Sequence, residues 1–381
     1  MPVSTTGPVQ LRSQLAERLD AEIAAAAAVP ARCAVLQAQR AILWLRHGHD
    51  VEARKELNRL QARALVHPNV ELAAWLHLAE GLRAYFSAFG GSARDRVRRA
   101  HVMATAAGAT SLRSLCDAWL AQMAFVDRDI DGVIAHAKAV LVSRNPDDHA
   151  ANYRVATAMA SAWSLAVGEA VARPWWSWTH QQAIAAGDAA GISAMIYNQA
   201  QMRVLHIRHA AFAGDVGAMP VALLGVDSIH NYDGAVGGSA RQDLTPLLRA
   251  QLLTVEGDFA AAATLLETHL PEAVAAGLAR VGGSLLADLA WCWANTGQGQ
   301  RARALADQAA VEVLAEDSPH CDLDERAALH ARLAQVYARL HEDGLAARQA
   351  DAAAEAWAQD AAQRREWAER LTAAGLVSPP R

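Results

Sequence analysis

Residues 247–278 read LLRAQLLTVEGDFAAAATLLETHLPEAVAAGL, and the architecture of the whole chain can be worked out from them. Their first part carries one apolar stripe at helical spacing, formed by Leu247, Leu248, Leu252 and Leu253. Gly257 then ends the helix at little steric cost, and Asp258 can cap the helix that follows. The second part has a stripe of its own, formed by Ala261, Ala262, Leu265, Leu266 and Leu270. The stretch therefore predicts two amphipathic helices joined by one tight turn.

Turns of the same kind recur along the chain at intervals of about 40 residues. They are expected near His49, Gly90, Arg128, Gly168, Gly214, Gly257, Gly297 and His341. A self-similar period in this range is typical of stacked helix pairs, because each pair buries its apolar face against its neighbours. The spacing therefore predicts a helical repeat array.

The repeated unit resembles a tetratricopeptide repeat, since Phe259 and Ala262 stand where that motif has an aromatic and a small residue. The period is longer than in the strict motif. It is closer to that of the maltose-regulon activator and of helical sensory regions attached to bacterial diguanylate cyclases. The resemblance implies an all-α fold, a right-handed α-solenoid of about eight antiparallel helix pairs, in a bacterial-type protein.

We expect a single solenoid over residues 31–375, preceded by a lead and a first helix in residues 1–30. Pro30 is expected to end that first helix, because proline cannot continue a helix that begins before it. Residues 376–381 contain two prolines and are expected to form a disordered tail.

Composition narrows the possible functions. The 381 residues carry a formal net charge of −5, which argues against a nucleic-acid partner. Four cysteines lie far apart without CxxC spacing, which favours reduced thiols and a cytoplasmic location. Neither a signal peptide nor an apolar run of about 18 residues is found, so we expect no membrane association. The sequence leaves the oligomeric state open.

The first helices of such repeats line the concave surface. Aligning the units on their turns gives one inward position in each, occupied by Gln122, Arg208, Gln251, Trp291 and Gln335, with Asn295 and Arg339 one turn further along. Polar residues with a tryptophan among them suit an extended peptide, so these residues are predicted to bind the partner. Trp293 faces another side of its helix than Trp291 and is expected to pack between helices.

Two segments interrupt the repeat. In the first, Trp175, Trp176 and Trp178 follow Pro174. Either two of them fill the core between repeats while the third covers a seam, or they form an aromatic anchor site for a partner, since tryptophan concentrates binding energy at interfaces.

The second interruption is residues 225–241, GVDSIHNYDGAVGGSAR, whose four glycines predict a loop rather than a helix. We expect this loop to project from the solenoid with its tip exposed, which consists of His230, Asn231, Tyr232 and Asp233. The loop is either a flexible insertion or a lid that contacts a partner. No GK[ST] motif follows its glycines, so a phosphate loop is not indicated.

The sequence contains no catalytic or cofactor-binding motif such as HExxH or GxSxG. His206 and His209 could share a helix face, but a metal site needs further ligands, so we predict no metal and no cofactor. Asp322 and Asp324 follow a Ser-Pro pair and are expected to be solvated loop residues.

These observations favour a non-catalytic scaffold or adaptor that binds a protein or peptide in the concave face of the solenoid. The alternative is a sensor or regulator whose superhelix changes shape when a peptide or small ligand binds, and so controls a partner. That alternative resembles the tetratricopeptide quorum receptors of comparable length.

Overall fold

The computed structural model describes residues 11–88, 91–143, 145–214, 219–236, 244–275, 279–314 and 322–380. Within these ranges the chain forms 17 α-helices and no strand, which confirms the predicted all-α class. The helices are α1 (Gln14–Ala25), α2 (Pro30–Arg46), α3 (Asp50–Val66), α4 (Val70–Ala88), α5 (Gly91–Ala106), α6 (Thr110–Val126), α7 (Ile130–Val142), α8 (His149–Ala166), α9 (Glu169–Ala185), α10 (Ala189–Phe212), α11 (Met219–Val236), α12 (Thr245–Glu256), α13 (Phe259–Ala275), α14 (Ala279–Asn295), α15 (Gly299–Leu314), α16 (Leu323–Arg339) and α17 (Asp343–Ala373).

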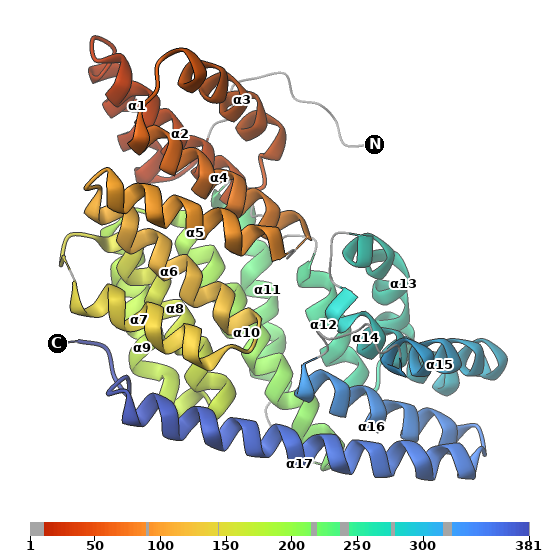
Figure 1. Ribbon diagram of the computed structural model, residues 1–381. Coiled ribbons are helices and arrows are strands. Elements are labelled where there is room, and N and C mark those ends of the chain that lie inside the picture. Colours follow the sequence, from red (N-terminus) through yellow and green to blue (C-terminus); the bar gives the residue numbers. More distant parts are fainter. Residues whose placement is uncertain are drawn as a thin grey trace.

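Helix α1 leads, and the following helices form eight pairs from α2 with α3 to α16 with α17, stacked as a solenoid (Figure 1). The predicted turn near Gly90 lies outside the described residues, and the chain turns at the other predicted places. Most of these turns use a glycine in the left-handed conformation, such as Gly257 at φ +94°. Arg128 and His341 adopt the same conformation at φ +56° and +62° with a side chain present. The packing of the helices on either side therefore fixes the turn even where no glycine is present.

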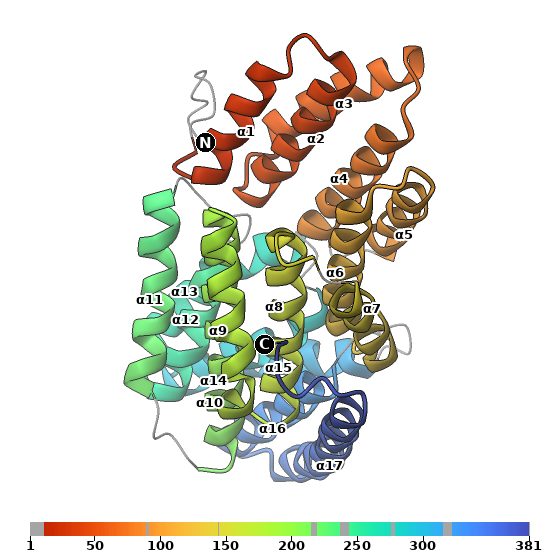
Figure 2. The same ribbon diagram turned by 90° about the vertical axis from the view of Figure 1, so that its left-hand side faces the viewer.

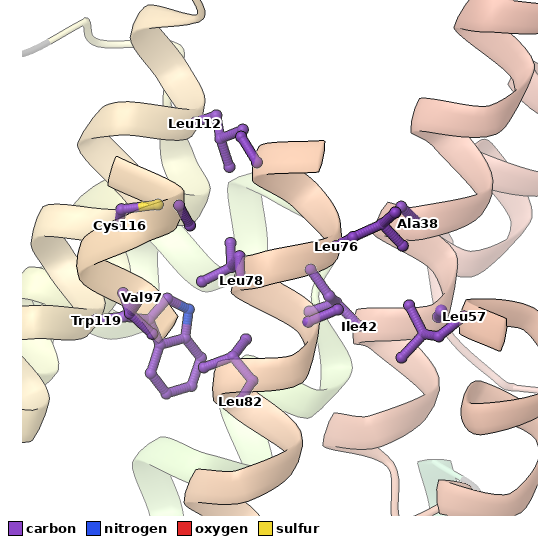
Figure 3. Packing of buried hydrophobic residues seen from close by; sticks show 14 of the residues in the cluster. Ala38, Ile42, Leu57, Leu76, Leu78, Leu82, Val97, Leu112, Cys116 and Trp119 are labelled. Atoms are coloured by element: carbon purple, nitrogen blue, oxygen red, sulfur yellow. The ribbon is translucent and has the colours of Figure 1, made fainter. Parts of the chain in front are cut away.

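Buried aliphatic side chains join each pair to the next. Figure 3 shows the first of these clusters, in which side chains of α2 to α6 meet: Ala38, Ile42, Leu57, Leu76, Leu78, Leu82, Val97, Leu112, Cys116 and Trp119. Alanines such as Ala38 and Ala79 are completely buried and leave room for neighbouring helices to approach closely. The high alanine content thus serves helix packing as well as helix propensity.

The predicted loop at residues 225–241 is wrong as far as the described residues reach, because α11 runs through Val236. Ala222, Val226, Ile229 and Val236 are buried at helical spacing, and this apolar stripe outweighs the cost of two glycines, about 1 kcal/mol each. Residues 237–241 lie outside the described residues.

The four expected tip residues of that segment do not project from a loop. Asp233 is buried, and its carboxylate accepts a hydrogen bond from the Ser193 hydroxyl. His230 and Asn231 are exposed on α11, and Tyr232 is half-buried. No site is formed by the four together.

The N-terminal helix is tied to the middle of the array, far along the sequence. The Leu15 backbone N–H donates to the Gly187 carbonyl at 2.9 Å, and the Ser13 hydroxyl donates to the same oxygen at 3.1 Å. Arg46 forms a bidentate pair with Asp188, with N–O distances of 2.6 and 3.0 Å. These contacts connect the first repeat to the turn that joins α9 to α10, so the superhelix folds back on itself (Figure 2).

The C-terminal helix makes a second long-range closure. Helix α17 runs along the lower edge of the molecule in Figure 1 and packs on α16, α8 and α7. The expected disordered tail is wrong for residues 376–380. Leu376 is buried, its carbonyl accepts the indole N–H of Trp163 at 2.8 Å, and the Val377 carbonyl accepts that of Trp175 at 3.2 Å. Two buried indoles without another acceptor hold the tail against α8 and α9.

Deleting residues 376–381 should lower the free energy of unfolding by about 3–5 kcal/mol, because two indole N–H groups lose their acceptors and a buried leucine is removed. Urea denaturation followed by tryptophan fluorescence measures this loss. A deletion of residues 379–381 alone is the matched control, since both carbonyls remain. Equal stability of the two truncated chains would contradict the proposed role of the tail.

Candidate functional site

A cavity of about 170 Å³ lies inside the superhelix, and its lining side chains come from α4, α6, α10, α12, α14, α16 and the turns beside them. All six are first helices of their pairs, as the concave surface of a repeat array requires. Three of the predicted partner-binding residues, Gln122, Arg208 and Gln251, line this cavity. Aligning the repeats on their turns therefore located part of the wall correctly.

Helix α10 supplies the longest wall. Asn198, Gln201, Leu205 and Arg208 recur at intervals of three and four residues, so they share one face and all line the cavity. The repeat alignment identified only Arg208 among them. The spacing of Asn198 and Gln201 from Arg208 on one helix face was the signal that could have identified these two residues as well.

One end of the cavity is closed by a buried ion-pair network. Arg208 lies 3.0 Å from a carboxylate oxygen of Asp288 on α14 and 3.1 Å from one of Glu325 on α16. Arg332 approaches the other oxygen of Asp288 at 2.7 Å. Asp288 and Arg208 are at most 1% exposed, so these charges are stable only as a paired set. Burial raises the pKa of Glu325, and Arg208 offsets only part of this effect.

A second group of charges joins the middle of the chain to its C-terminal repeat. The Arg128 guanidinium lies 3.1 Å from Asp322 and 3.0 Å from Asp324. The expectation that both aspartates are solvated loop residues is wrong, since Asp324 is buried in α16 and Asp322, at the N-cap position of that helix, pairs with Arg128. Burial raises the pKa of Asp324, but Arg128 together with Arg364 and the Glu325 backbone N–H outweighs burial and holds that pKa below its usual range.

The two histidines of α10, His206 and His209, belong to this charged region. Among the residues that the structure describes, no three His, Cys, Asp or Glu side chains are placed to hold a metal ion. Arg364 of α17 contacts the His209 Nδ1 atom at 3.2 Å, and the ring packs edge-on against Trp357. Burial lowers the pKa of His209 to about 3, so the ring is neutral at pH 7 and Nδ1 can accept this hydrogen bond.

The other predicted concave residues lie outside this cavity. Trp291 is half-buried and packs edge-on against Phe259, with ring centroids 6.0 Å apart. Asn295 donates to the Trp291 carbonyl, and Gln335 accepts from Arg332. Arg339 is exposed. These four residues continue the row of first helices beyond the closed end of the cavity, and their partner-binding role stays a prediction.

The orientation of Trp293 is as expected. It is 8% exposed within the cluster formed by α12 to α15, and its indole N–H donates to Glu267 at 2.8 Å. Trp291 and Trp293 therefore point to different sides of α14, and the groove position of Trp291 stays a prediction.

The tryptophan cluster of α9 is no exposed anchor, which overturns that alternative. Trp175, Trp176 and Trp178 are all buried, with Trp175 packed edge-on against Trp178 at 5.9 Å. Trp176 donates to the Ser164 hydroxyl at 3.2 Å. All three fill the packing of α8, α9 and the C-terminal tail, because the tail covers the face that the repeat alone would leave open.

The fold and the cavity together define a helical-repeat solenoid whose central cavity is lined by both polar and apolar side chains. No protein-family model matches the chain, and no curated protein matches its sequence. In structure the chain is similar to a Rap protein solved as a complex with competence and sporulation factor. The two agree with a TM-score of 0.56 and 11% sequence identity, over 92% of this chain and 95% of that chain. At such low identity this similarity supports the helical-repeat fold, and the residues of the cavity must be interpreted from their own geometry.

None of the described helices is long and apolar enough to cross a membrane.

Replacing Arg208 by methionine should lower the free energy of unfolding by about 3–5 kcal/mol, since it leaves Asp288 and Glu325 buried with fewer partners. Chemical denaturation at pH 7 measures the loss. Arg303 of α15 is the control, because its ion pairs with Asp307 and Glu342 lie at the surface, where such pairs contribute little to stability. If Arg208→Met lowered the free energy of unfolding as little as Arg303→Met does, the buried network would not be needed for stability.

Acid should destabilise the chain through His209. Its pKa is lower in the folded state than the ordinary value of about 6.5, so the unfolded chain binds the proton more tightly. The contribution of the neutral ring to the free energy of unfolding is complete at pH 7 and is lost progressively as the pH falls below about 6.5. At pH 5 the loss amounts to about 2 kcal/mol.

His209→Gln keeps an acceptor for Arg364 but cannot titrate. We therefore expect its unfolding free energy to fall less than that of the wild type between pH 7 and pH 5, in paired urea titrations. Parallel curves for the two proteins would mean that His209 titrates normally in the folded chain.

Proposed function

We propose that this chain is a non-catalytic, cytoplasmic adaptor that binds an extended peptide segment of a partner in its central cavity. The observation that carries the proposal is the set of amide side chains without partners in the cavity wall. The Gln122 Oε1 atom is buried and accepts no hydrogen bond, and the side chains of Gln201 and Gln251 make none among the described residues. Only the Gln122 Oε1 atom of this set is buried, since Gln201 is exposed and Gln251 is half-buried. A buried polar atom is normally satisfied, so Gln122 is suited to a ligand, and the amides of Gln201 and Gln251 in the same wall are accessible to that ligand.

A peptide backbone is the ligand that such a wall fits best. Each residue of an extended peptide offers one N–H donor and one C=O acceptor, and a glutamine amide can satisfy both kinds of group. The aromatic and apolar residues beside these amides, among them Tyr197 and Leu248, would contact side chains of the peptide. The Rap neighbour, solved with competence and sporulation factor, gives this fold a precedent as a ligand-bound solenoid.

A ligand-responsive sensor is the second candidate, and a specific observation favours it. The ion pairs between Arg128 and Asp324 and between Arg208 and Glu325 line the cavity and also join distant repeats. A ligand that changes these contacts would change the curvature of the superhelix. The similarity of the repeat period to the maltose-regulon activator would fit such a regulator and stays a prediction.

Blocking the cavity tests the proposal. The purified chain is mixed with a random pentapeptide library, and retained peptides are identified by mass spectrometry after size exclusion. We expect the wild type to retain a defined subset with dissociation constants of about 1 µM, and Gln251→Trp to lose at least about tenfold in affinity because the indole fills the cavity. Gln300→Trp, at an exposed position of α15, is the matched control.

Retention of the same peptides by Gln251→Trp, or of none by the wild type, would contradict binding in the cavity. Small-angle scattering with a retained peptide separates the two candidates. An unchanged radius of gyration supports the adaptor, and a changed one supports the sensor.

A further inference from the structure

A smaller cavity of about 40 Å³ adjoins the central one and shares four of its wall residues, Tyr85, Gln122, Tyr197 and Asn198. The guanidinium of Arg154, from α8, lies in the wall of this smaller cavity. The shared residues place the two cavities side by side, so a ligand group that passes between these side chains from the central cavity would meet Arg154, a buried cation.

Arg154 differs from the other buried arginines in lacking a carboxylate. Arg154, Arg208 and Arg332 are the arginines classed as buried among the described residues, and the latter two share Asp288. No described carboxylate lies within ion-pair distance of Arg154. In the described part of the chain its side chain makes one hydrogen bond, from Nη2 to the Tyr153 hydroxyl at 3.4 Å, and its buried Nε has no acceptor.

The surrounding residues hold this guanidinium in place without neutralising it. It stacks over the Trp119 ring at 3.9 Å and lies 5.1 Å from the centre of the Tyr153 ring. The nearby Arg46 and Asp188 pair with each other, so the region keeps one net positive charge. Burial lowers the pKa of Arg154, as expected for a guanidinium without a compensating anion.

We propose that Arg154 binds a carboxylate of the ligand that occupies the central cavity. A planar carboxylate can accept two parallel N–H bonds from a guanidinium, which is the strongest pairing open to this side chain. The stacked aromatic rings fix the plane of the guanidinium, so little further ordering is needed when the ligand enters. This inference rests on the proposed function only in assuming that a ligand enters the central cavity.

The test compares peptide libraries that differ in one group. Random pentapeptides are prepared with a free C-terminal carboxylate and, separately labelled, as C-terminal amides. We expect the wild type to retain free acids over amides by about tenfold or more, and Arg154→Met to lose this preference. Arg301→Met is the matched control, because Arg301 also stacks on a tryptophan at 3.9 Å but lines neither cavity.

The melting temperature of Arg154→Met is a second measurement, and it distinguishes a binding role of Arg154 from a purely structural one. Arg154→Met removes a buried charge that has no carboxylate, so its melting temperature should equal or exceed that of the wild type. A lower melting temperature combined with unchanged acid preference would overturn the inference.

The remaining outcomes separate the two proposals. In one outcome the wild type retains C-terminally amidated peptides that share an aspartate or glutamate, and Arg154→Met does not retain them. This outcome supports the inference, with a side-chain carboxylate as the source. Retained peptides that Arg154→Met binds equally well overturn it and leave the proposed function standing. If no peptide is retained, the proposed function fails, and benzoate and hexanoate are compared with their neutral amides by thermal shift. If the acids, but not their amides, stabilise the wild type and do not stabilise Arg154→Met, the result supports the carboxylate site. Equal stabilisation by acids and amides, or of both proteins by the acids, overturns it.

Discussion

Asp288 lies between the guanidinium groups of Arg208 and Arg332, and Asp324 lies against that of Arg128, in positions from which water is largely excluded. A solenoid held only by contacts between neighbouring repeats could vary its curvature, because each unit contacts only the next. These ion pairs join α10, α14, α16 and the turn after α6, so they fix how tightly the superhelix closes. Each charge is costly to bury alone, and all of them become tolerable only in the closed arrangement.

The fold could be predicted because it depends on local signals. A turn at Gly257 is specified by the few residues around it, and the repetition of such turns specifies the stacking. The error at residues 225–236 has a physical reason. The glycines predict a loop, but Val226, Ile229 and Val236 form a buried apolar stripe. Burying these three aliphatic side chains stabilises the helix by more than two glycines cost it.

The site was predicted only in part, because its geometry depends on residues far apart in the chain. Gln122, Arg208 and Gln251 could be found since they occupy equivalent positions in successive repeats. The contact between Arg128 and Asp324 spans 196 positions, and no local pattern announces it. The acceptors of the Trp163 and Trp175 indoles are backbone carbonyls, which any residue provides, so the sequence could not show that the tail covers this face.

Closure and the proposed ligand binding use overlapping residues, and this overlap determines how a bound ligand would act on the superhelix. Arg208 lines the cavity and holds Asp288 and Glu325 together, yet no described residue accepts a hydrogen bond from its Nε. A ligand group that reaches this atom would be bound by the same side chain that closes the superhelix. By linkage, such a ligand stabilises whichever curvature lets it make that contact. The difference between an adaptor and a sensor is then one of degree, set by how strongly the ligand's affinity depends on the contacts among α10, α14 and α16.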